Sequence, residues 1–470
     1  MNKPNVILIV LDTLRYDTFM KAIAGANDSA LVQLAEDSVV FSHAIAPAPW
    51  TTPSHVSLLT GRYPSDHGVH ESKEDKQSSP IMFKLLDYEN ELLTEKLRKG
   101  GYNTYGFVAN PNLFPGSGFE RGFKILQFCD MFHPILTKMD AFRKDIEVKW
   151  PSRKSEILDL ANNYSRDRVM KFIKRPSNLS ATPSLIRLYF SLFRQMKVSG
   201  YPALKGGDLV TSAFSNAFLE EPYFVFFNFM EAHDPYIVDR YNLFSGDGIK
   251  MLSYLAQETK ISRRTILKYK KIYDNQIFLL ETFISRIIDK LKQNGQYDRT
   301  VIIVTSDHGQ SFGENNFYGH GIFLSNELIR IPMLIKFPNQ VKFTPGRGYQ
   351  SLLNLYGFIQ GFLHGQIRPE SLTSEVVFSQ SFGIQEDYRK MFDSHPRIIN
   401  KLSDYDKEQL CACLGDIKCI LDISTGIVKF FDFESDREMN VTRFEADRLI
   451  DELRLFLGHK YKINIHQPLG

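Results

Sequence analysis

Several segments of this chain place carboxylate and imidazole side chains directly after short apolar runs. Together with one hydroxyl and one further imidazole from polar motifs, the set comprises Asp12, Thr51, His233, Asp234, Asp307, His308 and His320. Carboxylate oxygens and imidazole nitrogens are the ligands that divalent cations take in proteins. A single residue of this kind is commonly a helix cap or part of a turn. Four segments that each supply ligand-type residues predict a divalent metal site.

The stretch "TTPSHVSLLTG" at 51–61 predicts a helix with a reactive start. Pro53 suits the first helical turn, and Gly61 ends the helix. Thr51 then lies at the positive end of the helix dipole, where free N–H groups favour an alkoxide and an incoming tetrahedral anion. His55 follows four residues later, so its side chain points back along the same face towards Thr51. The alternative is that Thr51 is only the N-cap of this helix.

These side chains need a scaffold that brings them to one place. Buried strands are predicted for the continuous apolar runs at 5–12, 103–110, 223–236 and 300–309. Such runs are typical of parallel strands that are covered on both faces, and ligand sites lie outside their carboxyl ends. Helical patterns at 91–101 and 263–295 lie between the runs, and the second predicts one long helix that covers a sheet face. The fold class is therefore α/β with a doubly wound sheet.

Two regions depart from this alternation. Residues 128–215 are basic, aromatic and helix-like, which predicts a helical insertion over the site within a catalytic domain at 1–360. Residues 361–470 predict a small C-terminal α+β subdomain. Its expected strands and closing helix are 374–383, a hairpin at 417–440 and 442–458.

Composition excludes several classes of protein. The 470 residues carry a formal charge of +3, so we expect no general attraction to nucleic acid. No apolar stretch approaches the roughly 20 residues of a membrane span, and "MNKPNVILIVLD" does not resemble a signal peptide. Cys411, Cys413 and Cys419 match no common zinc spacing, which favours buried thiols in a reducing compartment. We therefore expect a cytoplasmic location.

A chain of motifs resembles the sulfatase family of the alkaline phosphatase superfamily. The resemblance depends on Asp12 after the first strand and on "TTPSHVSLLTGRYP", "HDPY", "SDHGQSFGENNFYGHGIFLSNELIRIP" and "KFFDFESDREMN". It runs from residue 5 to about 440, apart from the insertion at 128–215. It implies an alkaline-phosphatase-like fold, in which a mixed, mainly parallel sheet lies between helices.

The chain differs from the sulfatase family at the position of the nucleophile. Sulfatases use a cysteine or serine converted to formylglycine in a C/S-x-P-S-R motif, and the matching residues here begin at Thr51 and end at His55. A formylglycine hydrate releases sulfate by elimination, but a threonine ester requires in-line attack by water, as is usual for phosphoryl groups held by metal ions. Nucleotide pyrophosphatase-like enzymes and phosphoethanolamine transferases of the superfamily are similar in having threonine here. This variant favours a metal-dependent phosphoesterase or phospho-transferase.

The resemblance also implies roles for individual residues. A first metal site falls on Asp12, Thr51, Asp307 and His308, and a second on His233, Asp234 and His320. Zinc or manganese is favoured, whereas a single calcium or magnesium ion is the alternative. Thr51 would be the nucleophile, and His233 or His320 would protonate the leaving oxygen. His55 would hydrogen-bond the nucleophile or a phosphoryl oxygen.

Other expectations concern the substrate. Asn110 is a candidate for substrate contact, as are Arg62 and Arg330, for which structural ion pairs are the alternative. The substrate is expected to be a small-molecule, glycan-linked or lipid-linked anionic ester. Two alternatives to a phosphoesterase stay open, namely a sulfuric ester hydrolase that acts without formylglycine and an inactive sulfatase-like binding protein. The sequence predicts no oligomeric state.

Overall fold

The computed structural model describes most of the chain outside one long segment. The described residues are 3–25, 29–71, 81–129, 205–234, 236–239, 242–244, 255–256, 261–340, 343–346, 348–385, 389, 400–458 and 465. The chain divides into two compact units, of which the first comprises 1–129, 207–236 and 244–470. The predicted insertion falls largely on 130–204, which lie outside the described residues. Its helical character and its place over the site therefore stay predictions.

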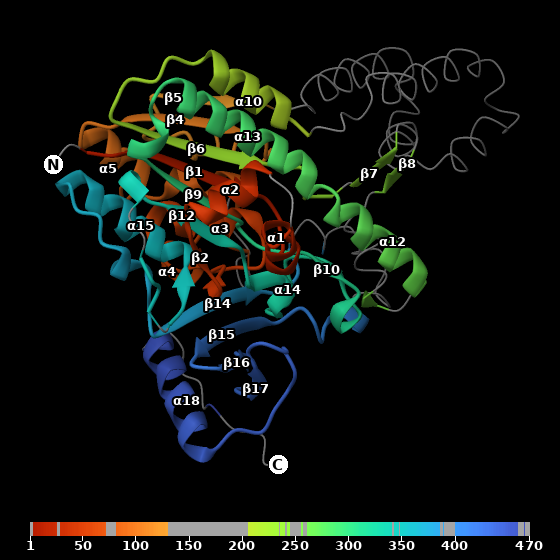
Figure 1. The fold of residues 1–470 in the computed structure, drawn as a ribbon. Helices are drawn as coiled ribbons and strands as arrows, with labels where there is room; N and C mark the ends of the chain where they lie inside the picture. Colours follow the sequence, from red (N-terminus) through yellow and green to blue (C-terminus); the bar gives the residue numbers. More distant parts are fainter. Residues whose placement is uncertain are drawn as a thin grey trace, which may run out of the picture. The chain divides into compact units, whose positions relative to one another are not determined.

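A seven-stranded sheet forms the centre of the first unit (Figure 1). Its strands, in spatial order, are β2 (Val39–Phe41), β12 (Met333–Lys336), β9 (Thr300–Thr305), β1 (Asn5–Leu11), β6 (Tyr223–Phe229), β4 (Asn103–Val108) and β5 (Ile125–Phe128). The five strands from β9 to β5 run parallel, whereas β12 is antiparallel to both of its neighbours. This confirms the predicted α/β class with a mixed, mainly parallel sheet.

Helices cover both faces of this sheet (Figure 1). On one face, Val6, Leu8 and Val10 of β1 pack in a single core with apolar residues of three helices, α3 (Thr51–Thr60), α5 (Leu93–Lys99) and α15 (Leu352–Gly361). On the other face, the Phe229 ring of β6 stacks on Phe283 at 5.5 Å. The helices on that side are α1 (Tyr16–Ile23), α2 (Ala30–Glu36), α10 (Gly207–Asn216) and α13 (Ile277–Gln293). Burial on both faces explains why the strands are uniformly apolar.

The predicted single helix at 263–295 is wrong, because two helices, α12 (Arg263–Asp274) and α13, occupy this range. The side-chain amide of Gln276 donates to the carbonyl oxygen of Ile272 at 3.0 Å. The main-chain N–H of Gln276 instead bonds to Tyr273 O at 2.9 Å, a tighter i−3 bond. The side chain thus takes the carbonyl that a continuous helix would use, and the chain bends there.

A second sheet with its own core follows the central sheet in the sequence. Its antiparallel strands are β14 (Val376–Phe382), β15 (Glu408–Leu414), β16 (Ile417–Asp422) and β17 (Val428–Asp432), and α18 (Arg443–Leu457) packs on them. The strand at 374–383, the hairpin and the closing helix were predicted, but β15 was not. Cys411, Cys413 and Cys419 lie buried as free thiols in β15 and β16, as expected. The domain boundary near residue 360 stays a prediction.

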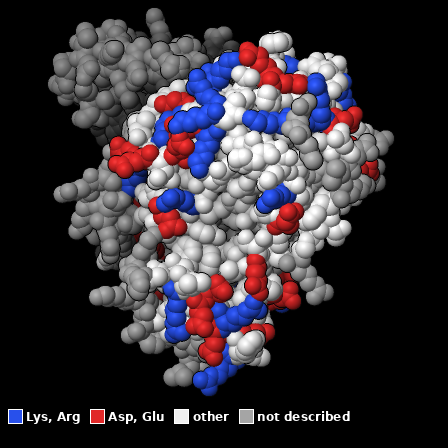
Figure 2. All heavy atoms as spheres, turned by 90° about the vertical axis from the view of Figure 1, so that its left-hand side faces the viewer, with Lys and Arg blue, Asp and Glu red and all other residues white. Residues whose placement is uncertain are grey.

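Shorter elements complete the described fold. They include β3 (Ala44–Ile45), α4 (Pro64–His67), β7 (Tyr236–Asp239), β8 (Asn242–Phe244), β10 (Ser311–Phe312), β11 (Tyr318–Gly319), α14 (Asn326–Ile329) and β13 (Gln350–Ser351). On the face shown in Figure 2, basic and acidic side chains are intermingled. Within the described ranges, no helix is both long enough and apolar enough to cross a lipid bilayer.

Candidate metal centre

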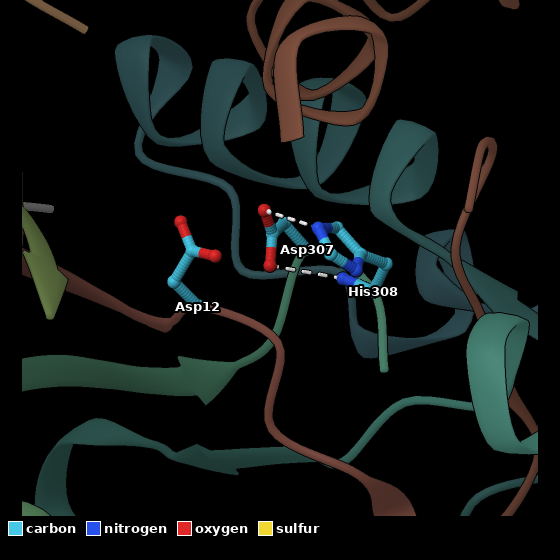
Figure 3. A group of neighbouring side chains, drawn as sticks. All are labelled: Asp12, Asp307 and His308. Atoms are coloured by element: carbon cyan, nitrogen blue, oxygen red, sulfur yellow. Dashed lines mark hydrogen bonds and ion pairs between the residues drawn. The ribbon is translucent and has the colours of Figure 1, made fainter. Parts of the chain in front are cut away.

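Three of the predicted ligands meet at the carboxyl edge of the central sheet. Asp12 follows β1, and Asp307 and His308 follow the neighbouring parallel strand β9. One ligand atom from each residue lies within 4.8 Å of the others, and all three side chains are buried. Figure 3 shows the Asp12 carboxylate facing that of Asp307. Across the described part of the chain, no other three His, Cys, Asp or Glu side chains form such a group.

Each carboxylate has one oxygen held by donors. Asp12 Oδ2 accepts hydrogen bonds from the side-chain amides of Asn110, at 2.6 Å, and Asn228, at 3.2 Å. Asp307 Oδ1 accepts the N–H groups of Thr13, at 3.1 Å, and His308, at 3.0 Å. The other oxygens, Asp12 Oδ1 and Asp307 Oδ2, are buried and have no hydrogen-bond partner among the described residues. Two open carboxylate oxygens that face each other fit a cation better than any neutral partner.

The electrostatics of the group lead to the same assignment. Burial raises the pKa of Asp12, and the charge of Asp307 raises it further. Burial likewise raises the pKa of Asp307. The pKa of His308 falls to about 4, because burial outweighs the attraction of Asp12. The group therefore combines two carboxyl groups whose ionisation burial disfavours with an imidazole that is neutral at neutral pH, and a divalent cation would favour the ionised carboxylates.

The orientation of His308 leaves a nitrogen for such a cation. Its Nδ1 lies 2.8 Å from the carbonyl oxygen of Gly309, so Nδ1 carries the proton. The lone pair of Nε2 then faces the centre, 3.5 Å from Asp307 Oδ2. A hydrogen bond at the far nitrogen is the usual way in which proteins fix a metal-binding histidine.

Thr51 contacts this group from the start of α3. Its Oγ1 lies 3.3 Å from His308 Nε2, and the residue is only 3% exposed. The N-cap of the helix is Trp50, in an extended conformation, so Thr51 is the first helical residue. The alternative that Thr51 is only an N-cap is therefore wrong. The hydroxyl faces the centre from the positive end of the helix.

His55 lies at the centre but has a different partner from the expected one. Its Nδ1 bonds to the main-chain oxygen of Thr51 at 2.9 Å, and the same nitrogen lies 3.5 Å from Asp307 Oδ2. The ring reaches back one helical turn, as its spacing predicts, but ends at the carbonyl group. Its Nε2 is buried, without a partner in the described chain. In this geometry His55 supports Asp307, whereas contact with a phosphoryl oxygen stays a prediction.

Two further imidazoles flank the group. The ring of His320 lies 4.6 Å from that of His308 and 5.1 Å from that of His233. His320 Nδ1 bonds to Gln310 Oε1 at 2.8 Å, and burial lowers its pKa well below the usual range. His233 Nδ1 lies 3.0 Å from Asp234 Oδ1. The structure thus brings His233 and His320 beside the first group, and the second metal site stays a prediction.

The three candidate substrate contacts have different surroundings. Asn110 is buried at the centre, where it donates to Asp12. Arg62 is exposed beyond the far end of α3 from Thr51. The Arg330 guanidinium pairs with Glu434 at 2.9 Å, donates to a main-chain oxygen and lies over the Tyr16 ring. The structure brings only Asn110 to the centre, and Arg330 matches the structural alternative.

Sequence reasoning missed several supporting residues. Asn228 is the last but one residue of the apolar strand β6, and a lone amide in a buried run was a usable signal. Thr13 has a positive φ of 58° and donates its N–H to Asp307. Tyr273, from α12, hydrogen-bonds the main chain on both sides of Leu14. No local pattern marked these last two, because their roles depend on contacts between distant segments.

Comparison with known proteins agrees with this architecture. The sequence model of the sulfatase family matches residues 4–359. An arylsulfatase from Clostridium perfringens is 23% identical over 379 residues, which cover 75% of this chain and 73% of the relative. The extracellular sulfatase SULF-1 homolog of Drosophila melanogaster is 24% identical over 343 residues, which cover 72% of this chain but 28% of the relative. The phosphonate monoester hydrolase of Agrobacterium radiobacter shares the fold, with a TM-score of 0.60, 17% identity and coverage of 97% and 94%.

Proposed function

The chain belongs to the sulfatase family, and we propose that it is a metal-dependent hydrolase of tetrahedral anionic esters that prefers phosphate esters. One observation carries this proposal: the Thr51 hydroxyl lies 3.3 Å from His308 Nε2, beside two buried carboxylates with open oxygens. A hydroxyl nucleophile next to a cation site is the arrangement used for in-line displacement at phosphorus.

Asp12, Asp307 and His308 would hold the cation. When bound, a divalent cation lowers the pKa of a neighbouring hydroxyl and stabilises charge on the transferred group. Thr51 Oγ1 gives its proton to solvent and attacks phosphorus, the bond from phosphorus to the ester oxygen breaks, and that oxygen is protonated as it leaves. Water then gives up a proton and attacks the phosphothreonine in line, and the Thr51 oxygen leaves with its bonding electrons and takes up a proton from solvent. An alcohol in place of water would make the chain a transferase.

We assign protonation of the leaving oxygen to His233 rather than His320. Burial lowers the pKa of His320 well below its usual range, and its Nδ1 already bonds to Gln310, so its Nε2 carries no proton at neutral pH. His233 Nδ1 instead lies 3.0 Å from the Asp234 carboxylate. An acid with a carboxylate partner is better suited to donate a proton.

A second candidate function is hydrolysis of a sulfate ester, which the arylsulfatase relative favours. Sulfate has the same tetrahedral shape, so the centre would accept it. A threonine ester lacks the elimination route of a formylglycine hydrate, however, and each sulfate would have to be displaced by water. For either ester, the expected substrate is a small-molecule, glycan-linked or lipid-linked anion. A binding protein without activity is disfavoured, because each ligand position holds a competent residue.

The test compares four activated aryl esters: a phosphodiester, a phosphate monoester, a phosphonate monoester and a sulfate. Each is incubated with metal-free protein and with added zinc, manganese, calcium or magnesium. We expect metal-dependent turnover that is highest on a phosphorus ester. Highest turnover on the sulfate would favour the second candidate function. Absence of turnover with every ester and metal would contradict both.

Thr51→Ala is expected to lower kcat by about a thousandfold or more, because it removes the attacking oxygen. Thr51→Ser should keep part of the activity. The control is Thr60→Ala at the other end of α3, where the hydroxyl donates to Val56 O and accepts the N–H of Arg62, away from the centre. An acid quench during turnover, followed by peptide mass spectrometry, should find the phosphoryl group on Thr51. Unchanged turnover in Thr51→Ala would refute the nucleophile.

A further inference from the structure

Thr13 adopts a backbone conformation that β-branched residues avoid. Its φ is 58°, in the left-handed region, at the third position of a turn that Leu14 N–H closes on Leu11 O at 3.1 Å. Turns of this kind favour glycine or asparagine at that position. The Thr13 hydroxyl is buried and finds no hydrogen-bond partner among the described atoms, so the side chain does not stabilise the turn. The surroundings must hold the strained conformation in place.

Two side chains from distant segments bond this turn: Ser306 Oγ accepts the N–H of Leu14 at 3.0 Å, and the Tyr273 hydroxyl bonds the residues on either side of Leu14. Tyr273 comes from α12 and is fully buried. Its hydroxyl donates to Thr13 O at 2.8 Å and accepts the N–H of Arg15 at 2.7 Å. Burial raises the pKa of Tyr273 well above its usual range, so the hydroxyl stays a donor at any ordinary pH. One hydroxyl thus joins two peptide groups of the turn that follows β1.

The conformation of this turn decides where one ligand carboxylate points. The N–H of Thr13 donates to Asp307 Oδ1 at 3.1 Å, and the N–H of His308 binds the same oxygen. These two bonds leave Oδ2 facing the centre. Rotation of Thr13 to a negative φ would turn its N–H away from Asp307. Asp307 Oδ1 would then keep only the N–H of His308 as a donor.

We propose that Tyr273 is a positioning residue of the metal centre, whose hydroxyl holds Thr13 in its left-handed conformation and so fixes Asp307 for a divalent cation. The inference rests on the metal site of the proposed function and extends it to a residue that touches neither cation nor substrate. Outer partners that orient metal ligands commonly contribute about ten- to a hundredfold in affinity.

The experiment measures Mn²⁺ affinity by calorimetric titration of the metal-free full chain. Tyr273→Phe removes only the hydroxyl and keeps the ring that packs at 4.9 Å on Phe312. We expect its Kd for Mn²⁺ to rise about tenfold. The matched control is Tyr349→Phe, which removes another buried tyrosine hydroxyl, bonded to Gly415 O at 2.7 Å, in a different part of the fold. Its Kd should stay at the wild-type value, even with an equal loss of thermal stability.

A second substitution separates positioning from general stability. Glycine adopts a φ near 58° without strain, so the turn no longer needs the tyrosine hydroxyl. Adding Thr13→Gly to Tyr273→Phe should therefore restore Mn²⁺ affinity to within about twofold of wild type, which a double-mutant cycle measures. If Tyr273→Phe and Tyr349→Phe have the same Kd for Mn²⁺, the inference is overturned. It is also overturned if adding Thr13→Gly to Tyr273→Phe does not restore the affinity for Mn²⁺.

The two proposals fail in different ways. If the wild-type chain binds none of Mn²⁺, Zn²⁺, Ca²⁺ or Mg²⁺, the proposed function fails. The positioning inference is then decided by a crystal structure of Tyr273→Phe. A Thr13 that keeps its positive φ there overturns the inference, and a Thr13 that relaxes to a negative φ, with loss of its bond to Asp307, supports it.

Discussion

At the residue scale, each carboxylate of the candidate metal centre has hydrogen-bond donors on only one of its two oxygens. One oxygen of Asp12 and one of Asp307 are oriented by buried amide donors, whereas the opposite oxygens meet without a donor in the described structure. Donors on one oxygen fix the orientation of each carboxylate, so the group is ordered before any cation arrives. A centre of this kind lowers the entropy cost of binding a cation, because its ligands are already held in place.

Asn110→Ala tests this orientation at Asp12. The substitution removes the 2.6 Å donor and leaves only the longer contact from Asn228. We expect the Kd for Mn²⁺ to rise about tenfold, since a hydrogen bond to a charged group is worth about 1.5–3 kcal/mol. Calorimetric titration measures it. Asn103→Ala, at the opposite end of β4, should leave the Kd unchanged, and an equal Kd in both variants would show that Asn110 does not orient Asp12.

The candidate metal ligands were easier to predict from the sequence than the residues that hydrogen-bond to them. Asp12, Asp307 and His308 were predictable because each follows an apolar run, and parallel strands end at one edge. Asn110 was expected to contact substrate, which stays a prediction; the structure shows it donating to Asp12, and a loop pattern does not show which way an amide points. Arg330 fits its motif, but the pairing that holds it comes from Glu434, about a hundred residues later in the chain.

At the scale of elements, α3 determines where Thr51, the proposed nucleophile, lies. All of its residues are buried, it packs with α5 and α15, and Gly61 ends it in the left-handed conformation with a φ of 65°. A Cβ at Gly61 would lie 2.7 Å from the Tyr356 ring of α15, so both the conformation and the space require glycine. Of these features, only the end of the helix at Gly61 was readable in the sequence. The break between α12 and α13 was not, because it depends on a bond that one glutamine side chain makes to its own helix.

His67, at the end of α4, hydrogen-bonds to α3 and makes the stability of the fold depend on pH. Its Nδ1 accepts the N–H of Val69 at 3.0 Å, and its Nε2 lies 3.0 Å from Ser57 Oγ of α3. Burial, and then the neighbouring His70, lower its pKa to about 3, from 6.5 in the unfolded chain. The unfolded chain therefore binds a proton between pH 6.5 and 3 that the folded chain excludes, so this contribution to stability is present above pH 6.5 and is lost as the pH falls towards 3.

His67→Asn should remove this acid sensitivity. The asparagine oxygen accepts the N–H two residues on, as in an Asx turn, but does not titrate. We expect the variant to have a lower free energy of unfolding than wild type at pH 7, and the two values to converge as the pH falls to 4. The lowered pKa of His67 corresponds to about 5 kcal/mol of wild-type stability, which is lost as the histidine takes up a proton. Urea unfolding at several pH values measures this. A difference that stays constant with pH would contradict the assignment, and exposed His364→Asn is the control.

At the scale of the whole molecule, the C-terminal sheet supports the segment that carries His320. Ser381 of β14 donates to Ile322 O at 2.5 Å. Lys418 of β16 is buried, donates to Leu324 O at 3.2 Å and to Asn326 at 2.9 Å, and pairs with Asp436. The segment after His320 thus lies against a second core. The sequence predicted the elements of this sheet but not its contacts, because long-range pairing leaves no local pattern.

Cation binding should control the stability of the whole fold. Burial raises the pKa of Asp12 and that of Asp307 in the folded chain, and the charge of Asp307 raises the pKa of Asp12 further, so ionising these carboxylates costs folding free energy. A cation at one hundred times its Kd adds about 2.7 kcal/mol to the free energy of unfolding. Protons compete for the same two carboxylates, so this gain should shrink as the pH falls towards their raised pKa values.

The measurement is a thermal melt of metal-free protein with and without Mn²⁺ or Zn²⁺ between pH 5 and 8. The cation should raise Tm by several degrees at pH 8 and by much less at pH 5. Asp307→Asn removes one of the two like charges, so without metal it should melt above wild type at neutral pH, yet gain nothing from the cation. Asp289→Asn, exposed on α13, should behave as wild type. An equal gain in Asp307→Asn would place the cation elsewhere, because only the central pair of carboxylates couples cation binding to this pH dependence.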